Sequence, residues 1–229
     1  MASKLTQELK FVGVDDGFFS IKVVDEAGNC FSIPSRATHD VVMVDAGAET
    51  DKSFIFETEG RKFTVDENVP NPLDTRALTS PYPISDLNRV LIHAGLVSAG
   101  LGGESVSITT GLPVRDYFLP TTEKNQKLID NKTDSLKKSV TCGINNNIAT
   151  ANIISSKVCS EGIAAFIDLM LDNKGNKTKQ ADELQSGVTA IIDIGGHTTD
   201  CAVLLPKMKI NMQRSGSASV GVLNLHDGV

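Results

Sequence analysis

The stretch IIDIGGHTTD, residues 191–200, places an acid, a Gly pair and a Thr pair directly after a short apolar run. The apolar run, VTAIIDI, predicts a buried strand, and a second apolar run, CAVLL, follows the polar residues. Taken alone, the polar stretch fits two structures. One is a tight hairpin turn that uses Asp and Gly for ordinary turn chemistry, and the other is a loop that holds a phosphate.

A stretch near the start of the chain repeats this arrangement. FVGVDDG, residues 11–17, ends a predicted buried strand with an acid and a Gly, as AIIDIGG does, so Asp15 and Asp193 take equivalent positions. Glycine lets the backbone approach a ligand closely with its N–H groups outward. Hydroxyl groups and one lysine follow: Ser20, Lys22, Thr198 and Thr199. Two such loops favour a pair of phosphate-binding hairpins, whose two Asp suit a hydrated Mg²⁺.

Composition excludes several classes of protein. The 229 residues carry a net charge of -6 and no long basic block, which argues against direct, non-specific binding to nucleic acid. No apolar stretch is long enough to span a membrane, and the polar N-terminus lacks the apolar core of a signal peptide. The four Cys stand alone, so we expect reduced thiols in a cytoplasmic protein, with Cys159 and Cys201 as small core residues.

The first third of the chain predicts strands joined by tight turns. Residues 11–15 and the two runs within 20–33 predict an antiparallel meander that turns at Gly28 and Asn29. Residues 53–66, SFIFETEGRKFTVD, predict a second hairpin that turns around Gly60. Four prolines follow it between residues 70 and 83. We therefore expect an inserted small subdomain at about residues 36–83.

The rest of the chain predicts helices and strands in alternation. Residues 85–100 predict a helix with Ser85 as its N-cap, which Gly100 helps to end, and residues 105–114 predict a strand. Residues 121–139 contain five Lys and predict a surface helix or loop, whose charges we interpret as a solvated face rather than an interaction face. Residues 148–158 predict a strand. The helix predicted at 161–172 has its apolar face at Ile163, Phe166, Ile167 and Met170.

Several of these segments carry a resemblance to a known family. VDDGFFSIKV, residues 14–23, looks like the first phosphate loop of the actin-fold ATPases, and IIDIGGHTTD looks like the second, a pattern that seventy-kilodalton heat-shock chaperones share. Further segments resemble the ParM/StbA group, bacterial actin-like proteins that segregate plasmids. They are ITTGLPVRDYF (108–118), VCSEGIAAFIDLM (158–170) and GSASVGVLNL (216–225), in the family's order.

The resemblance implies roles for individual residues. Asp15 and Asp193 would position Mg²⁺ through water, and Glu161 would orient the water that attacks the γ-phosphate. Phosphate-loop residues would be Gly17, Ser20 and Lys22 in the first loop and Gly195, Gly196 and Thr198 in the second. Taken alone, Glu161 is interpreted as an acid that stabilises a helix N-terminus, and His197 is better interpreted as a turn residue.

One departure from the family concerns the first loop. Phe18 and Phe19 stand where the family has small or hydroxyl residues. Phosphate contacts there then depend on backbone N–H groups, Ser20 and Lys22, or the loop has a different shape.

The resemblance also implies an α/β fold of the actin-like, ribonuclease-H-like type, with mixed sheets flanked by helices. We expect a polar extension at 1–9, a first domain at 10–185 and the start of a second domain at 186–229. The family continues well past this point, so we expect a truncated form whose second half is incomplete. Apolar surfaces that the absent part covers would then be exposed.

The function implied is that of an ATP-dependent (or GTP-dependent) filament-forming ATPase of plasmid segregation. Its partners would be further copies of itself, head to tail, and an adaptor protein bound to plasmid DNA, without direct DNA or membrane contact. Three alternatives stay open. They are a small-molecule kinase of the same fold, a chaperone-type ATPase, and a non-catalytic truncated protein that caps filaments.

Overall fold

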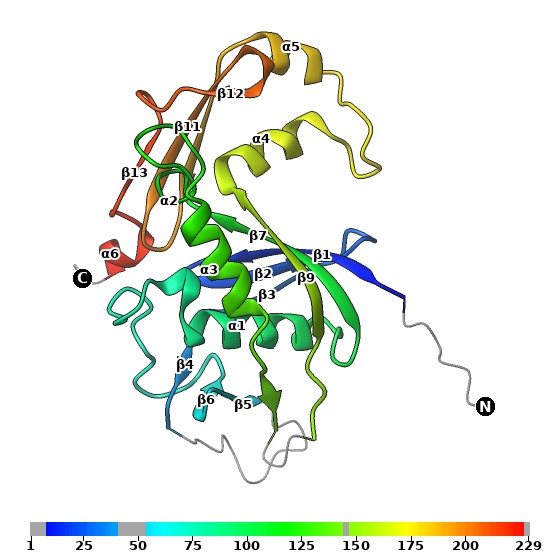
Figure 1. The fold of residues 1–229 in the computed structure, drawn as a ribbon, viewed down its shortest axis with the longest axis vertical. Helices are drawn as coiled ribbons and strands as arrows, with labels where there is room; N and C mark the ends of the chain where they lie inside the picture. The colour runs from blue at the N-terminus through cyan, green and yellow to red at the C-terminus, as the bar shows by residue number, and fades with distance from the viewer. Residues whose placement is uncertain (1–7, 41–53, 144–146, 227–229) are drawn as a thin grey trace. The chain divides into compact units, whose positions relative to one another are not determined.

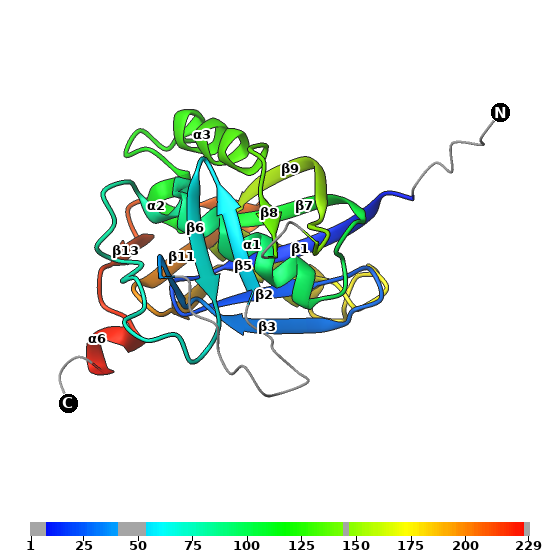
Figure 2. The same cartoon turned by 90° about the horizontal axis from the view of Figure 1, so that it is seen from below.

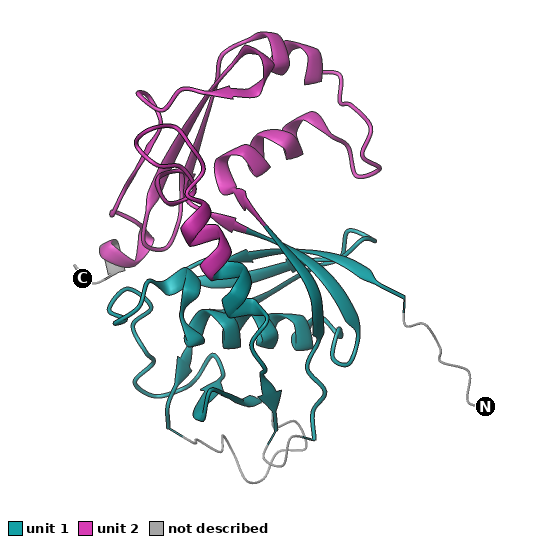
Figure 3. Cartoon of the chain, viewed as in Figure 1, with its two compact units in different colours: residues 1–110, 132–157 teal, residues 111–131, 158–229 magenta. Residues whose placement is uncertain are grey.

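The computed structural model describes residues 8–40, 54–143 and 147–226 (Figure 1). Its contacts divide the chain into two compact units (Figure 3). Unit 1 holds residues 1–110 and 132–157, and unit 2 holds residues 111–131 and 158–229. The predicted domain boundaries refer to the halves of the resembled family and stay a prediction. Residues 1–7 of the predicted extension and 41–53 of the predicted insert lie outside the described residues.

Among the described residues, the strands that lie wholly or mainly in unit 1 form two sheets, with strand orders β3-β2-β1-β7-β9 and β4-β6-β5-β8. The strands of the first are β1 (Lys10–Asp16), β2 (Ser20–Val24), β3 (Cys30–Pro34), β7 (Ser105–Leu112) and β9 (Asn152–Ser160). Those of the second are β4 (Ala37–Thr38), β5 (Phe54–Thr58), β6 (Arg61–Val65) and β8 (Thr141–Cys142). β1 pairs antiparallel with β2 and parallel with β7, which confirms a mixed sheet that opens with a meander.

The helix α1 (Asp86–Ser98) packs against strands of both sheets of unit 1 (Figures 1 and 2). Because both sides are covered, its ten residues from Leu87 to Leu96 are all buried. The predicted N-cap is confirmed, since the Ser85 side chain accepts a hydrogen bond from the Asn88 N–H. A Cβ at Gly95 would lie 2.9 Å from the Ile21 side chain, so glycine permits the close approach of α1 and β2.

In the part of unit 2 that the structure describes, one antiparallel sheet is present, in which β11 pairs with β10, β12 and β13. The strands are β10 (Thr189–Ile194), β11 (Thr199–Leu205), β12 (Lys209–Ile210) and β13 (Gly216–Ala218). The helices are α2 (Val114–Tyr117), α4 (Glu161–Met170), α5 (Ala181–Ser186) and α6 (Val222–His226). α4 packs on β10 and β11, whereas Ile192 and Ile194 of β10 are 68% and 67% exposed.

The helix α3 (Gln126–Leu136) corrects the interpretation of residues 121–139 as a solvated face. Four of the five Lys are exposed, as that interpretation expects. Lys132 is only 1% exposed and pairs with a buried acid of β1. A count of charges along the sequence missed it because Lys132 lies on the buried face of the helix, together with Ser135 and Leu136.

Other predictions need smaller corrections. In α4, Phe166 and Met170 are buried but Ile167 is 37% exposed, because the buried face is centred on Gly162, Phe166 and Met170. The predicted core cysteines are only half-buried, and Cys142 is the buried thiol, where burial raises its pKa to about 11. The strand predicted at 148–158 lies two to four residues later, at 152–160. Among the described residues, no helix is long and apolar enough to cross a membrane.

Candidate phosphate-binding hairpins

The first candidate hairpin joins β1 to β2 in unit 1. Asp15 and Lys22 lie directly opposite each other in the strand register, so their side chains share one face of the sheet. The Lys22 Nζ donates to the Asp15 carboxylate at 2.7 Å, and both side chains are about half exposed. The structure therefore brings two of the predicted site residues together, with a carboxylate and an ammonium group both open to solvent.

Asp16, the next residue, points to the opposite face. Successive side chains alternate along a strand, so Asp16 faces the core with Val12 and Val14 and is only 8% exposed. Its carboxylate accepts hydrogen bonds from Lys132 Nζ at 2.7 Å and Asn88 Nδ2 at 2.8 Å, and also from the Thr110 hydroxyl. Asp16 was assigned no role from the sequence, although strand alternation after Val12 and Val14 predicts that it is buried.

The loop of the first hairpin, Gly17–Phe19, is held by its carbonyl oxygens. Each of the three carbonyls accepts a hydrogen bond from residues that follow β3. The bonds are Ser35 Oγ to Gly17 O (2.7 Å), Tyr82 Oη to Gly17 O (3.2 Å), Thr75 Oγ1 to Phe18 O (3.3 Å) and Ser35 N to Phe19 O (2.9 Å). In a planar trans peptide the N–H points away from the carbonyl before it. The N–H groups of residues 18–20 are therefore turned away from these donors.

The two phenylalanines of this loop have different environments. The Phe18 ring lies 4.7 Å from that of Tyr82 and packs against the core of unit 1, whereas Phe19 is 60% exposed. Burial raises the pKa of Tyr82 above its usual range, so its hydroxyl stays a donor to Gly17 O. Phe18 thus anchors the loop, and the loop's outward groups are backbone N–H groups, Ser20 and Lys22.

The second candidate hairpin joins β10 to β11 in unit 2. The Gly195 N–H donates to the Thr198 carbonyl at 2.8 Å, so residues 195–198 form the turn and His197 lies inside it, as predicted. The carbonyls of Gly195 and Gly196 accept bonds from the N–H groups of Val222 (3.0 Å) and Leu223 (2.9 Å) at the start of α6. By the same peptide geometry, the N–H groups of residues 196 and 197 are turned away from α6.

Gly221 makes this contact possible. A Cβ at residue 221 would lie 2.6 Å from the Gly195 oxygen and 2.5 Å from the Gly196 oxygen, so a larger residue would push α6 off the turn. The resemblance of the segment GSASVGVLNL to the family did not include this reason for its second glycine, Gly221.

Two acids flank the second turn as well. Asp193 lies opposite Asp200 in the register and is exposed, whereas Asp200 is 5% exposed. Asp200 accepts hydrogen bonds from the hydroxyls of Thr198, at 2.7 Å, and Ser217. The predicted phosphate contact of Thr198 stays a prediction, and its hydroxyl is directed to Asp200 within the hairpin.

Glu161 is the first residue of α4 and is half-buried in unit 2. A Cβ at Gly111, at the end of β7, would lie 2.5 Å from the Glu161 Cγ, so this glycine makes room for the carboxylate side chain. A Cβ at Gly162 would lie 2.5 Å from that of Ala202, so a second glycine lets the start of α4 approach β11. Two glycines that were not singled out from the sequence thus make room for Glu161 and for the start of α4.

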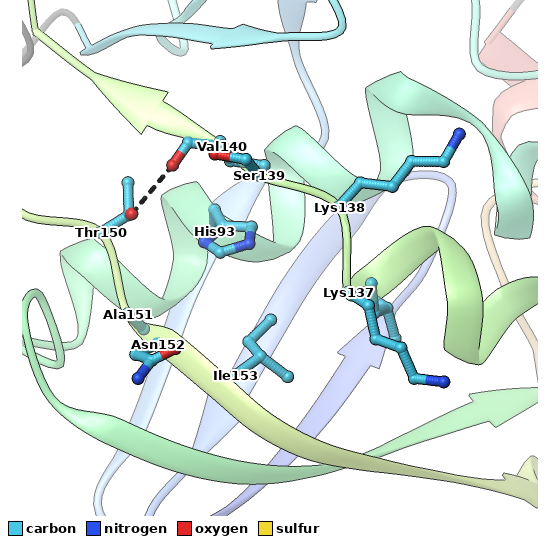
Figure 4. A pocket seen from close by; sticks show the side chains of 10 residues that line it. His93, Lys137, Lys138, Ser139, Val140, Thr150, Ala151, Asn152 and Ile153 are labelled. Atoms are coloured by element: carbon cyan, nitrogen blue, oxygen red, sulfur yellow. Dashed lines mark hydrogen bonds between the residues drawn. The ribbon is translucent and has the colours of Figure 1, made fainter.

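A pocket in unit 1 is separate from all of these residues (Figure 4). Its volume is about 320 Å³, His93 of α1 lies at its centre, and residues 136–140 and 150–153 surround it. The ammonium groups of Lys137 and Lys138 point away from His93, toward Asp134 and Glu59. Both His93 ring nitrogens are buried and have no hydrogen-bond partner within the described ranges. Burial lowers the pKa of His93 to about 4, so the ring is neutral.

The acids of the hairpins fit Mg²⁺ as a partly hydrated ion. No group of three or more metal-ligating side chains occurs among residues the structure describes. Mg²⁺ is usually held by one or two carboxylates together with water and phosphate oxygens, which is what an exposed Asp15 or Asp193 can supply.

Comparison with known proteins gives a family match. The model of the family described as plasmid segregation protein ParM, N-terminal (StbA_N), matches residues 10–171. A search of curated proteins gave no significant match.

Solved structures show the same fold. The archaeal actin homologue Ta0583 is 23% identical with a TM-score of 0.65, and the match covers 96% of this chain and 64% of that one. The apo psk41 ParM protein is 19% identical with a TM-score of 0.65, covering 96% and 68%. A 15-stranded ParM filament from Clostridium botulinum is 15% identical with a TM-score of 0.64, covering 96% and 67%. Ta0583 is also known in complex with ADP. The chain therefore has the actin-like α/β fold and spans 64% of the length of Ta0583.

Proposed function

The chain belongs to the family of the plasmid segregation protein ParM, N-terminal, and we propose that it acts in plasmid segregation as an actin-like protein that polymerises with bound nucleotide. One observation carries the proposal. In both hairpins the loop carbonyls accept hydrogen bonds from donors of the same unit. The N–H groups that follow these carbonyls therefore point away from those donors. Consecutive outward N–H groups next to glycines form a concavity that suits a phosphate.

The first hairpin adds charge to this arrangement. Lys22 would neutralise phosphate charge, and Ser20 would add a hydroxyl contact beside the N–H groups. A bound phosphate would compete with Asp15 for the Lys22 ammonium, which the carboxylate now holds at 2.7 Å. Asp15 and Asp193 would hold hydrated Mg²⁺, which supplies positive charge to the phosphates.

Glu161 is proposed to orient the water that attacks the terminal phosphate. Hydrolysis of a phosphoanhydride needs positioning and charge stabilisation more than covalent chemistry, and a carboxylate can align a water and accept its proton. We expect Glu161→Ala to slow hydrolysis by about 10²-fold or more while nucleotide affinity stays nearly unchanged. Asp168→Ala, an exposed acid on the same helix, is the matched control. Equal loss of binding and hydrolysis would refute this role.

The filament is proposed from the relatives. One similar structure is a ParM filament, and head-to-tail contacts between identical subunits generate filaments rather than closed rings. We propose that an adaptor protein links the filament to plasmid DNA in the bacterial cytoplasm, since the net charge of -6 disfavours direct contact with DNA. The ADP complex of Ta0583 suggests an adenine nucleotide, with GTP as the alternative to test.

The proposal is tested by binding, sedimentation and phosphate release with Mg·ATP and Mg·GTP. We expect nucleotide-dependent sedimentation, and a roughly tenfold or greater loss of affinity in Lys22→Ala, because a charge-assisted contact to phosphate is removed. Lys62→Ala, an exposed lysine of β6, should leave affinity unchanged. A chain that binds neither nucleotide would overturn the proposal. Binding without sedimentation or hydrolysis would favour the filament-capping alternative.

A further inference from the structure

The two adjacent acids of the first hairpin are in opposite environments. Asp15 is half-exposed and meets an exposed lysine, whereas Asp16 and its partner Lys132 are 3% and 1% exposed in their side chains. A buried ion pair is costly to desolvate and is weak evidence for a gain in stability. Its presence at the end of β1, directly before the loop, therefore calls for another explanation.

Three elements of unit 1 meet at the Asp16 carboxylate. Asn88 comes from the first turn of α1, Thr110 from β7 and Lys132 from α3, and each of the three is 1% exposed. All of them donate to the two oxygens of one side chain. Because several donors fix the carboxylate in both position and direction, they also fix the backbone of residue 16, to which the loop is attached.

We propose that Asp16, held by Lys132, Asn88 and Thr110, is the positioning residue of the first phosphate loop. Its burial leaves Asp15 as the acid that faces the ligand, and it sets the direction in which residues 17–20 leave β1. The carbonyls of residues 17–19 then reach Ser35, Thr75 and Tyr82, and their N–H groups face outward. The effect on nucleotide binding rests on the function proposed above, whereas the effect on the loop does not.

The test separates positioning from stability. Lys132→Met alone leaves a buried carboxylate unpaired, so the informative variant is Asp16→Asn combined with Lys132→Met, which removes both charges at similar volume. Replacing a buried ion pair with neutral groups of similar size is often neutral for stability. The control is Arg89→Met, which removes another buried cation of α1, one that binds Glu59, Asp86 and Ser135 rather than Asp16.

Two measurements decide the outcome. The first is the backbone ¹⁵N order parameters of residues 17–20, which we expect to fall from about 0.85 to below about 0.6 in the double variant and to stay high in Arg89→Met. The second is the affinity for Mg·ATP, which we expect to fall about tenfold in the double variant although its unfolding midpoint matches wild type. Unchanged order parameters and unchanged affinity would overturn the inference.

The two proposals fail in different ways. A wild-type chain that binds no nucleotide overturns the proposed function, and the order parameters still decide the role of Asp16. If the double variant does not fold, Asn88→Ala removes a single neutral donor to Asp16. We then expect a smaller fall in the order parameters of the same loop residues, and a rigid loop in that variant would refute the positioning role.

Discussion

In the first hairpin the loop carbonyls accept hydrogen bonds mainly from the side-chain hydroxyls of Ser35, Thr75 and Tyr82, whereas in the second they accept them from the backbone N–H groups of Val222 and Leu223. The hydroxyl donors lie 18 to 65 residues from their acceptors along the chain. The donors to the second turn lie 27 residues from their acceptors, and both come from the start of α6. The first loop thus depends on several separate segments of unit 1, whereas the second depends on one short helix.

The two buried acids, Asp16 and Asp200, also differ in how far along the chain their partners lie. Asp16 is neutralised by Lys132, from a distant helix, whereas Asp200 accepts hydrogen bonds from Thr198 and Ser217, which lie 2 and 17 residues away. A charge-paired acid ties its loop to other elements more strongly than an acid bound by hydroxyls does. Similar turns can therefore be stabilised by an ion pair or by hydroxyl hydrogen bonds. Substitutions of these partners should distinguish the two kinds of stabilisation.

The largest effect is expected where the charge pair is broken. Lys132→Met leaves the buried Asp16 without its cation, so we expect a loss of about 3–5 kcal/mol in the free energy of unfolding. Asp200→Asn keeps an acceptor for both hydroxyl groups and should cost about 1–3 kcal/mol. Urea unfolding of both variants measures the difference. Equal losses would show that the two buried acids are held equally strongly.

Acidification should act on unit 1 through His93. Its pKa is lowered from 6.5 to about 4 by burial and by the nearby Arg89, while Lys137 and Lys138 also line its pocket. The unfolded chain then binds the extra proton between about pH 6.5 and pH 4, so stability falls as the pH is lowered through this window. The difference between these two pKa values corresponds to a loss of about 3 kcal/mol in the free energy of unfolding.

The measurement is the free energy of unfolding against pH for wild type and His93→Leu. Because carboxylates also titrate in this range, the difference between the two proteins isolates the imidazole. We expect the variant to lose less stability than wild type below pH 6.5. His39→Gln, a substitution on the surface of unit 1, is the control. Parallel curves for wild type and His93→Leu would rule out a buried neutral imidazole.

The second hairpin should be sensitive to a single methyl group. In Gly221→Ala the new Cβ would lie about where the Gly195 and Gly196 oxygens approach, so α6 must move and its two N–H bonds weaken. We expect a loss of about 1–3 kcal/mol, the usual cost of overpacking. Gly216→Ala is the matched control, since a Cβ there meets nothing within 4 Å. Similar unfolding midpoints for the two variants would mean that α6 does not hold the turn.

Much of the frame was predictable from the sequence. Apolar runs bounded by Gly and Asp predicted β1, β2, β10 and β11, and an N-cap serine with helical spacing predicted α1. The family resemblance implied mixed sheets, but the parallel pairing of β1 with β7 was not predicted, because it joins segments about a hundred residues apart. Pairing between distant strands depends on tertiary packing, and a local sequence pattern does not predict it.

The side chains behind the hairpins were harder to predict for a different reason. Asp15 was assigned a role from the sequence and Asp16 was not, since a buried acid is recognised by its partners, and Lys132 and Asn88 are 116 and 72 residues away. Gly111 and Gly221 were likewise unassigned, because what they make room for, Glu161 and the turn at 195–196, comes from other parts of the chain. Pattern reasoning located the turns but not the residues that hold them.

The smallest expected effect concerns one hydroxyl group. Tyr82→Phe keeps the ring contact with Phe18 but removes a donor to the Gly17 carbonyl, which Ser35 continues to bind. A net hydrogen bond contributes about 1 kcal/mol, so we expect that loss in unfolding free energy and a few-fold weaker affinity for Mg·ATP. Tyr117→Phe, in unit 2, is the control and should bind as wild type does. Wild-type affinity in Tyr82→Phe would show that the Ser35 bond alone sets the carbonyl, and that the first loop needs fewer distant donors than its structure contains.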